Sequence, residues 1–424
     1  MNNRTAVPTP TTAPAKRAPA IPRSVEIGVA CLAVFAVGGR FTVQQGLTVA
    51  IVMAVLLVPV WLGPLMRMRG GIIVVILGVL TPLSGSVLTT LMEPTHRTNT
   101  SLEQMNAFLV IGLVGGIGLL VWARSVMGDG MTALVFGIGL FAAIPARGID
   151  AANPWKLTLS VPTVIVVLAV CMIFEAKIAE ILSLVALAFV GVFNDSRSAT
   201  SILLIAASLL VWQLVRRRSG GRSSAWRLVG GLALFGFIAY NALQTFILDG
   251  WLGEGAQARS EAQIQVAGSI IAGGRPEMGA TVALLLYNPF GFGSGTIPTF
   301  SDVIVAKTGM HSLNYAPNNG YVENYMLGGG FEVHSLTGDF WLRFGLIGAA
   351  LLLTLVVLTI VGTARSLVDH AAHGLLIVLA IQVTWDALFS PLFSTSLSTL
   401  SLGVALAMIP RRQANGQPSA LPGI

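Results

Sequence analysis

Long apolar stretches alternate with short polar connections along nearly the whole chain. Most have the roughly 17–25 residues that a helix needs to cross the hydrocarbon core of a bilayer, and charges, Pro or Gly bound them. The pattern therefore predicts an all-α polytopic membrane protein with about twelve spanning helices. We place these at residues 25–39, 43–62, 71–91, 106–122, 130–145, 157–174, 177–193, 198–215, 227–247, 341–362, 373–389 and 393–409.

One segment, residues 248–340, contains no spanning stretch. Connections of this length are usually either functional or disordered. Its aromatic and apolar residues favour a folded loop over disorder. The expected organisation is a disordered basic tail (1–24), an N-terminal bundle of about nine helices (25–247), an extracytoplasmic loop (248–340), C-terminal helices (341–409) and a second tail (410–424).

The charged residues indicate orientation rather than a nucleic-acid partner. Only 10% of the 424 residues are charged and 54% are hydrophobic, whereas soluble domains carry roughly 25% charged residues. With a cytoplasmic N-terminus, inner segments hold 16 of the 25 Lys and Arg residues, as the positive-inside rule requires. The overall charge of +7 is thus a topology signal. We expect a multi-pass protein of the plasma membrane with both termini in the cytoplasm.

Few residues are suited to carry chemistry. Cys31 and Cys171 lie in apolar stretches, which excludes a disulfide scaffold and a cysteine metal site. His370 and His373 belong to an inner connection, and we expect His96 to be a surface residue. This leaves His311 and His334, both in the outer loop.

His334 directly precedes a spanning stretch. A histidine there is suited to general base catalysis, since the side chain ordinarily titrates near pH 6.5. The alternative is a loop histidine without a role. His311 opens a similar His-Ser-Leu tripeptide, but no spanning helix follows it.

Two arginines are predicted on the same outer face. Arg197 begins a spanning stretch and Arg275 lies in a Gly-Gly-Arg-Pro-Glu segment. Guanidinium groups bind phosphate bidentately, so the pair is suited to a pyrophosphate where other enzymes use a divalent ion. The alternatives are an Arg197 that reaches the lipid headgroups and an Arg275 paired with Glu277.

Two other functional classes receive little support. The glycines at 291–295 suggest a phosphate loop, but no Lys-Ser/Thr follows them, so a nucleotide site is a weak hypothesis. A coupled transporter usually places ionisable groups deep in its helices. Here the spanning stretches contain mainly Glu26, Glu180 and Asp386. The acidic residues of the outer face are scattered, so no metal site is expected.

The order of these pieces resembles the O-antigen ligase family, which includes bacterial O-antigen and exopolysaccharide polymerases. The resemblance covers roughly residues 190–362. It rests on Ser-Arg at 196–197, Gly-Arg at 274–275, Asn-Pro-Phe-Gly-Phe-Gly at 288–293, and His334 followed by Gly345 and Gly348. It implies a GT-C-like membrane glycosyltransferase that needs no metal or other cofactor and inverts the anomeric carbon.

The resemblance also assigns roles and partners. The donor would be a glycan on undecaprenyl pyrophosphate and the acceptor a glycan or lipid-linked hydroxyl, with the bilayer and other polysaccharide assembly proteins as partners. Arg197 and Arg275 would hold the pyrophosphate, and His334 would activate the acceptor. Supporting candidates are Asp339, His311 and Tyr321, with Arg343 as a third phosphate contact. The alternative function is a transporter or flippase that moves lipid-linked sugars without covalent chemistry.

Overall fold

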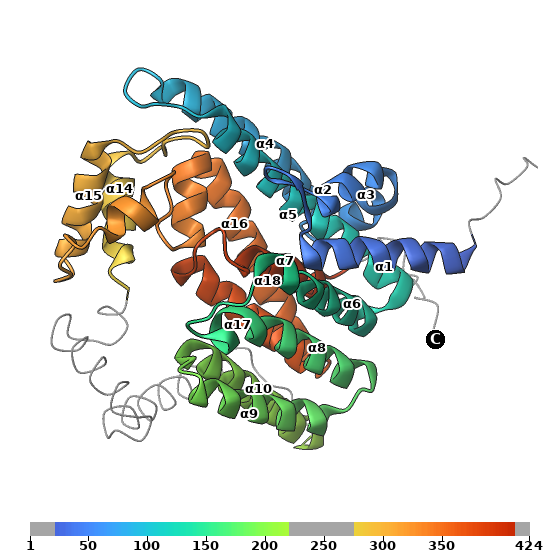
Figure 1. Cartoon of the computed structure of the whole chain (residues 1–424). Coiled ribbons are helices and arrows are strands. Elements are labelled where there is room, and N and C mark those ends of the chain that lie inside the picture. Colours follow the sequence, from blue (N-terminus) through green and yellow to red (C-terminus); the bar gives the residue numbers. More distant parts are fainter. Residues whose placement is uncertain (1–21, 220–274, 412–424) are drawn as a thin grey trace, which may run out of the picture.

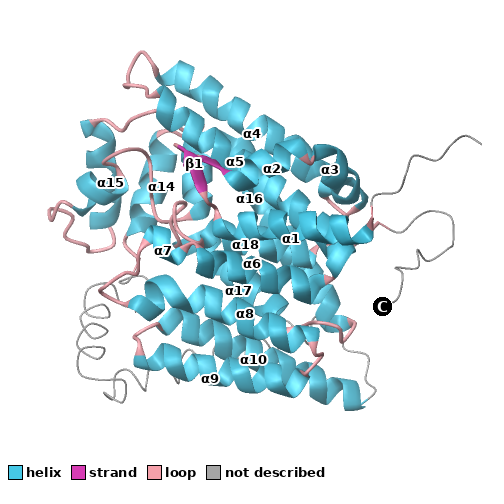
Figure 2. Cartoon of the chain, turned by 45° about the vertical axis from the view of Figure 1, so that its right-hand side comes forward, coloured by secondary structure: helices cyan, strands magenta, loops and turns pink. Residues whose placement is uncertain are grey.

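The computed structural model describes residues 22–219 and 275–411, which form a bundle of helices with one short hairpin (Figures 1 and 2). The elements of the first part are α1 (Arg23–Gly39), β1 (Thr42–Gln44), β2 (Leu47–Thr48), α2 (Val49–Leu56), α3 (Val58–Arg67), α4 (Gly71–Met92), α5 (Thr100–Met127), α6 (Asp129–Ala142), α7 (Ile144–Arg147), η1 (Trp155–Leu159), α8 (Ser160–Ile173), α9 (Lys177–Phe193) and α10 (Arg197–Ser219). Those of the second part are α14 (Glu277–Tyr287), α15 (Phe300–His311), η2 (Val322–Met326), α16 (Leu336–Val368), α17 (Gly374–Phe389) and α18 (Ser396–Ala407).

The all-α, polytopic character predicted from hydropathy is confirmed. Six helical stretches within the described ranges are long and apolar enough to cross a membrane, or seven if a bent pair is counted as one span. The helices α1, α9, α17 and α18 are shorter, with 17, 17, 16 and 12 residues. The predicted span 227–247 lies outside the described residues. A total of twelve spans stays a prediction.

The stretch 43–62, predicted as one spanning helix, is not a single helix in the structure. This segment starts with the β1–β2 hairpin and continues as α2 and α3, which are bent by 80° at Leu57. Pro59 stands at the start of α3. Proline has no N–H to donate to the preceding turn, so an unbroken helix is disfavoured here.

Helix α4 shows how the bundle presents an apolar surface on its outside. Its large exposed side chains recur every three or four residues and form a stripe: Ile73, Ile76, Val79, Leu80, Leu83, Val87 and Leu91. The opposite face is buried and consists largely of small residues, including Gly78 and Gly85. An added Cβ at Gly78 would lie 2.7 Å from Val114 of α5. Small residues allow the close helix contact typical of membrane bundles, and the outward stripe fits lipid.

Connections from distant parts of the sequence meet at one end of the bundle, which we call the hairpin end. It contains the β1–β2 hairpin and the connections at 93–99, 148–154, 288–299, 327–335 and 390–395. The Thr98–Thr296 bridge joins two of these connections, and the Leu392 N–H donates to Asp339. At the opposite end, the Arg69 N–H donates to the Ile409 carbonyl. The topology prediction makes the hairpin end the outer one.

The described part of the predicted outer loop is folded. Helices α14 and α15 pack against each other so closely that a Cβ on Gly279 would lie 2.1 Å from the Gly309 carbonyl oxygen. Both views show the pair beside the connection between α4 and α5 (Figures 1 and 2). Together with η2 and the start of α16, the pair encloses a second hydrophobic core that includes Phe292, Met310 and Phe331. This core supports the candidate site.

Candidate functional site at the hairpin end

A break inside α16 receives the glycine-rich segment. Gly345 has φ 64° and ψ −156°, a conformation outside the helical region that glycine adopts with little strain. The break leaves the Leu342 carbonyl oxygen to accept bonds from the Phe292 and Gly293 N–H groups, at 2.7 and 3.2 Å. Gly291 passes so close that a Cβ would lie 2.5 Å from the Trp341 carbonyl oxygen. These glycines therefore permit close backbone packing.

The same segment does not form a phosphate cradle. Such a cradle needs several backbone N–H groups free to face an anion. All five N–H groups of residues 291–295 instead donate to protein oxygens, on Asn288, Leu342, Gly85 and Thr89. The hypothesis of a phosphate-binding loop at 291–295 is thus wrong, and the segment is structural.

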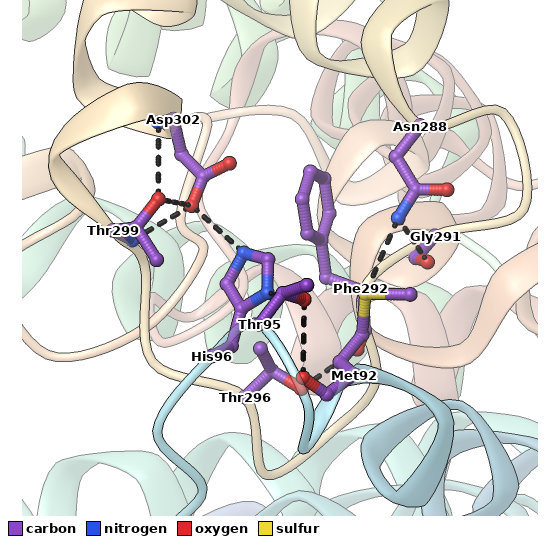
Figure 3. A network of polar contacts seen from close by, with 9 residues as sticks. All are labelled: Met92, Thr95, His96, Asn288, Gly291, Phe292, Thr296, Thr299 and Asp302. Atoms are coloured by element: carbon purple, nitrogen blue, oxygen red, sulfur yellow. Dashed lines mark hydrogen bonds and ion pairs between the residues drawn. The ribbon is translucent and has the colours of Figure 1, made fainter.

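His96 fixes the glycine-rich segment to α15 (Figure 3). Its Nε2 lies 3.1 Å from Asp302 Oδ2, and the exposed fractions of the two side chains are 10% and 1%. The same carboxylate oxygen accepts bonds from the N–H and hydroxyl of Thr299, both at 2.7 Å, within a capping box. The His96 ring also meets the Phe292 ring edge-on at 5.7 Å. The expectation that His96 is a surface residue is wrong, because its side chain is only 10% exposed and contacts Asp302. The sequence could not indicate this contact, because the two residues are 206 positions apart.

His334 occupies a strained position at the mouth of α16. Its φ is 56°, in the left-handed region that a small minority of residues other than glycine adopt. The backbone is held on both sides. The Val333 N–H donates to Asp339 at 2.7 Å, and Ser335 caps α16 while donating to the Ala387 carbonyl oxygen at 3.1 Å. His334 Nδ1 is buried with no hydrogen-bond partner among the described residues. Maintained strain of this kind is typical of functional sites.

Three side chains gather next to this histidine, and together with it we call them the His334 cluster: Arg275, Glu277, Tyr321 and His334. The rings of Tyr321 and His334 lie 5.8 Å apart between centroids. The Tyr321 hydroxyl donates to Glu277 Oε1 at 2.9 Å. Three separate segments therefore supply the cluster, as the sequence prediction for Arg275, Tyr321 and His334 requires.

Arg275 is anchored to the end of α17. Its Nη1 donates to the Phe389 carbonyl oxygen at 3.2 Å, and its guanidinium lies 5.5 and 5.6 Å from the ring centroids of Trp385 and Phe389. No ion pair with Glu277 occurs in the part of the chain that the structure describes. The Arg275–Glu277 salt bridge considered from the sequence is therefore not formed, and one face of the guanidinium is held by aromatic rings.

Glu277 is the site residue that sequence reasoning assigned no function. Its Oε2 is buried and, within residues 22–219 and 275–411, has no hydrogen-bond partner. Burial raises the pKa of Tyr321, and the charge of Glu277 raises it further, while Arg275 lowers it. Tyr321 therefore stays a neutral donor to Glu277. A buried carboxylate oxygen without a donor can accept a hydrogen bond from another molecule. The only signal in the sequence was its position two residues after Arg275.

Asp339 and Arg343 hold the backbone next to the cluster. Asp339 is fully buried, and its two oxygens accept the Val333 and Leu392 N–H groups at 2.7 and 2.9 Å. Arg343 is 3% exposed and donates to the Phe331 carbonyl oxygen and Asn106 Oδ1, both at 2.8 Å. These contacts give both residues a positioning role. They do not direct Arg343 toward a ligand, as the third-phosphate hypothesis would require.

Two predicted residues lie elsewhere. Arg197 is the first residue of α10, and its Nε lies 3.3 Å from Asp195. It stands at the hairpin end, but the described contacts do not link it to the His334 cluster. His311 is the last residue of α15 and is exposed. The structure thus distinguishes the two histidines: His334 belongs to the His334 cluster and His311 does not, although both begin a His-Ser-Leu tripeptide.

Comparison with known proteins does not assign the chain to a family, so its class rests on its own structure. No protein-family model, curated protein or solved structure matches it. The fold and the apolar helices define a helical, multi-pass membrane protein. Its site is a cluster of a cation, a carboxylate, a phenol and an imidazole at one end of the bundle.

Proposed function

We propose that the protein is a membrane glycosyltransferase that transfers or polymerises a glycan from a polyprenyl pyrophosphate, without a metal, at the outer face of the plasma membrane. The observation that carries the proposal is the His334 cluster. It combines an aromatic-backed guanidinium with two buried polar atoms, His334 Nδ1 and Glu277 Oε2, that have no partner in the described part of the chain. A transferase needs these groups for its leaving group and its nucleophile.

In the proposed step, His334 takes the proton of an acceptor hydroxyl as that oxygen bonds to the anomeric carbon. The bond from the anomeric carbon to the pyrophosphate oxygen breaks, and the pyrophosphate leaves as an anion beside Arg275. A positioned base contributes roughly 10²–10⁴-fold in rate, and fixed positive charge stabilises the leaving group. Glu277 Oε2 and Tyr321 orient sugar hydroxyls. The resemblance to O-antigen ligases and polymerases is what supports Arg197 as a second phosphate ligand, since the described contacts do not link it to the His334 cluster.

The test is an assay with purified protein and a polyprenyl-pyrophosphate oligosaccharide, scored for chain extension or transfer. His334→Ala should lower product formation by roughly 10²–10⁴-fold. His311→Ala is the matched control, because that histidine is exposed, and it should stay near wild type. If His311→Ala alone abolishes activity, the wrong histidine has been assigned.

Lysine variants test the phosphate contacts. Arg275→Lys and Arg197→Lys keep the charge but lose the bidentate fork, so both should be severely impaired. Wild-type turnover in either would count against that residue's role. Activity should survive exhaustive chelation. Translocation of the lipid-linked glycan without a covalent product would favour the flippase alternative instead.

A further inference from the structure

A cavity opens at the hairpin end, apart from the His334 cluster. Its volume is about 690 Å³, within the range of ligand sites. Ser390 in its wall directly follows Phe389, whose carbonyl oxygen holds Arg275 on the other side. The end of α17 therefore separates the cavity from the His334 cluster. Ser196 and Ser198, on either side of Arg197, also line it.

Three cationic side chains line this cavity: Arg40, Arg147 and Lys156. Arg147 Nη2 donates to the Gly39 carbonyl oxygen at 2.6 Å, next to Arg40. None of the three forms an ion pair with any residue that the structure describes. Burial and the charge of Arg147 lower the pKa of Arg40 to about 10. Like charges are thus held together where their own neighbours do not compensate them.

The carboxylate in the lining does not neutralise this group. Asp386 is 3% exposed and already accepts bonds from Gln382 Nε2, Ser390 Oγ and Thr399 Oγ1, at 2.7, 2.6 and 3.1 Å. All three donors are neutral and lie on α17, α18 or the segment between them. The cations at the other wall therefore remain available to an anion.

The rest of the lining combines uncharged polar side chains, most of them serine or threonine, with an apolar part. Ile51, Leu109 and Leu113 belong to α2 and α5, within the helix bundle. Leu157, next to Lys156, also lines the cavity and is 56% exposed. A free inorganic anion would gain nothing from these surfaces, whereas a lipid would bury its chain against them.

We propose that this cavity binds the head of a membrane lipid that carries a phosphate monoester or pyrophosphate, with Arg40, Arg147 and Lys156 as its ligands. Three cations match a head group with two or more negative charges better than a singly charged phosphodiester. The ligand belongs to the same class as the donor of the proposed reaction, but the cavity shares no residue with the His334 cluster, and binding is measured without turnover. Failure of one proposal therefore leaves the other standing.

The experiment measures binding of polyprenyl phosphate to the purified full-length protein in detergent. Uncharged polyprenol, inorganic pyrophosphate and phosphatidylglycerol serve as competitors. Arg40→Gln and Arg147→Gln should each weaken binding by roughly ten- to hundredfold, as expected for hydrogen bonds to charged groups. Lys156→Gln changes an exposed side chain and should weaken it by about two- to fivefold. Thermal unfolding checks that each variant is folded.

Arg97→Gln is the matched control. Arg97 is an exposed arginine at the hairpin end that does not line the cavity, so its loss should leave affinity unchanged. Lys156→Gln keeps the test decisive if an arginine variant fails to fold. Equal binding by wild type and all folded cavity variants would overturn the proposal. Equally effective competition by polyprenol, inorganic pyrophosphate or phosphatidylglycerol would overturn the assigned lipid head.

Discussion

Asp339 connects the strained histidine to the segment between α17 and α18, and its replacement tests how the site is held. Its two oxygens accept different donors, the Val333 and Leu392 N–H groups, at 2.7 and 2.9 Å. In Asp339→Asn, one carboxylate oxygen is replaced by an NH₂ group, which faces a backbone N–H and cannot accept a hydrogen bond from it. At least one buried donor is left unsatisfied, which costs about 1–3 kcal/mol.

This cost should appear as local opening of the backbone. A loss of about 1–3 kcal/mol raises the open population by roughly 5- to 150-fold. Hydrogen exchange followed by mass spectrometry should show faster exchange in the peptides that contain Val333 and Leu392. Asp339→Ala removes both acceptors and should increase exchange further, in both peptides.

Glu332→Gln provides the matched control. It removes a carboxylate from the same segment that forms no hydrogen bond to a described residue and acts on Asp339 and Arg343 only through its charge. Exchange at Val333 and Leu392 should stay within about threefold of wild type, a change below 1 kcal/mol. Asp339→Asn with the same exchange as this control would refute the positioning role.

Three further outcomes test other parts of the structure. Gly345→Ala forces a side chain into φ 64° and should lower the free energy of unfolding by about 1–3 kcal/mol. Gly63→Ala, with no atom within 4 Å of the added Cβ, should change it little in thermal unfolding. His96→Ala and Asp302→Ala should each destabilise the protein, and the double variant should show a coupling of about 0.5–3 kcal/mol; additive losses would contradict the pair. Because the pKa of Tyr321 is raised in the folded state, its contribution is complete below about pH 10 and is lost as the pH rises through the folded value. The free energy of unfolding of Tyr321→Phe should therefore fall less than that of wild type as the pH rises above about 10. The same pH dependence in both proteins would exclude this titration.

The helical class and most helix positions followed from the sequence. Hydropathy is a sum over neighbouring residues, so it needs no knowledge of what packs where. The position of His334 before α16 was also predicted, because turn residues and charges mark helix ends locally. The bend at Leu57 was missed, although Pro59 marks it, because overall hydropathy outweighed a single residue.

Only the tertiary structure decided which of these residues act together. Glu277 meets Tyr321 across 44 residues, and His96 meets Asp302 across 206. No local pattern distinguishes a buried, unsatisfied carboxylate from a solvated one. Nor does any local pattern show that the glycines of 291–295 let the backbone of this segment pack against the break in α16. Likewise, Arg40, Arg147 and Lys156 are 107 and nine residues apart in the sequence and line one cavity. Hydropathy fixes where each helix runs, but side-chain packing decides which charges share an enclosed space, and that determines which of them can bind a ligand.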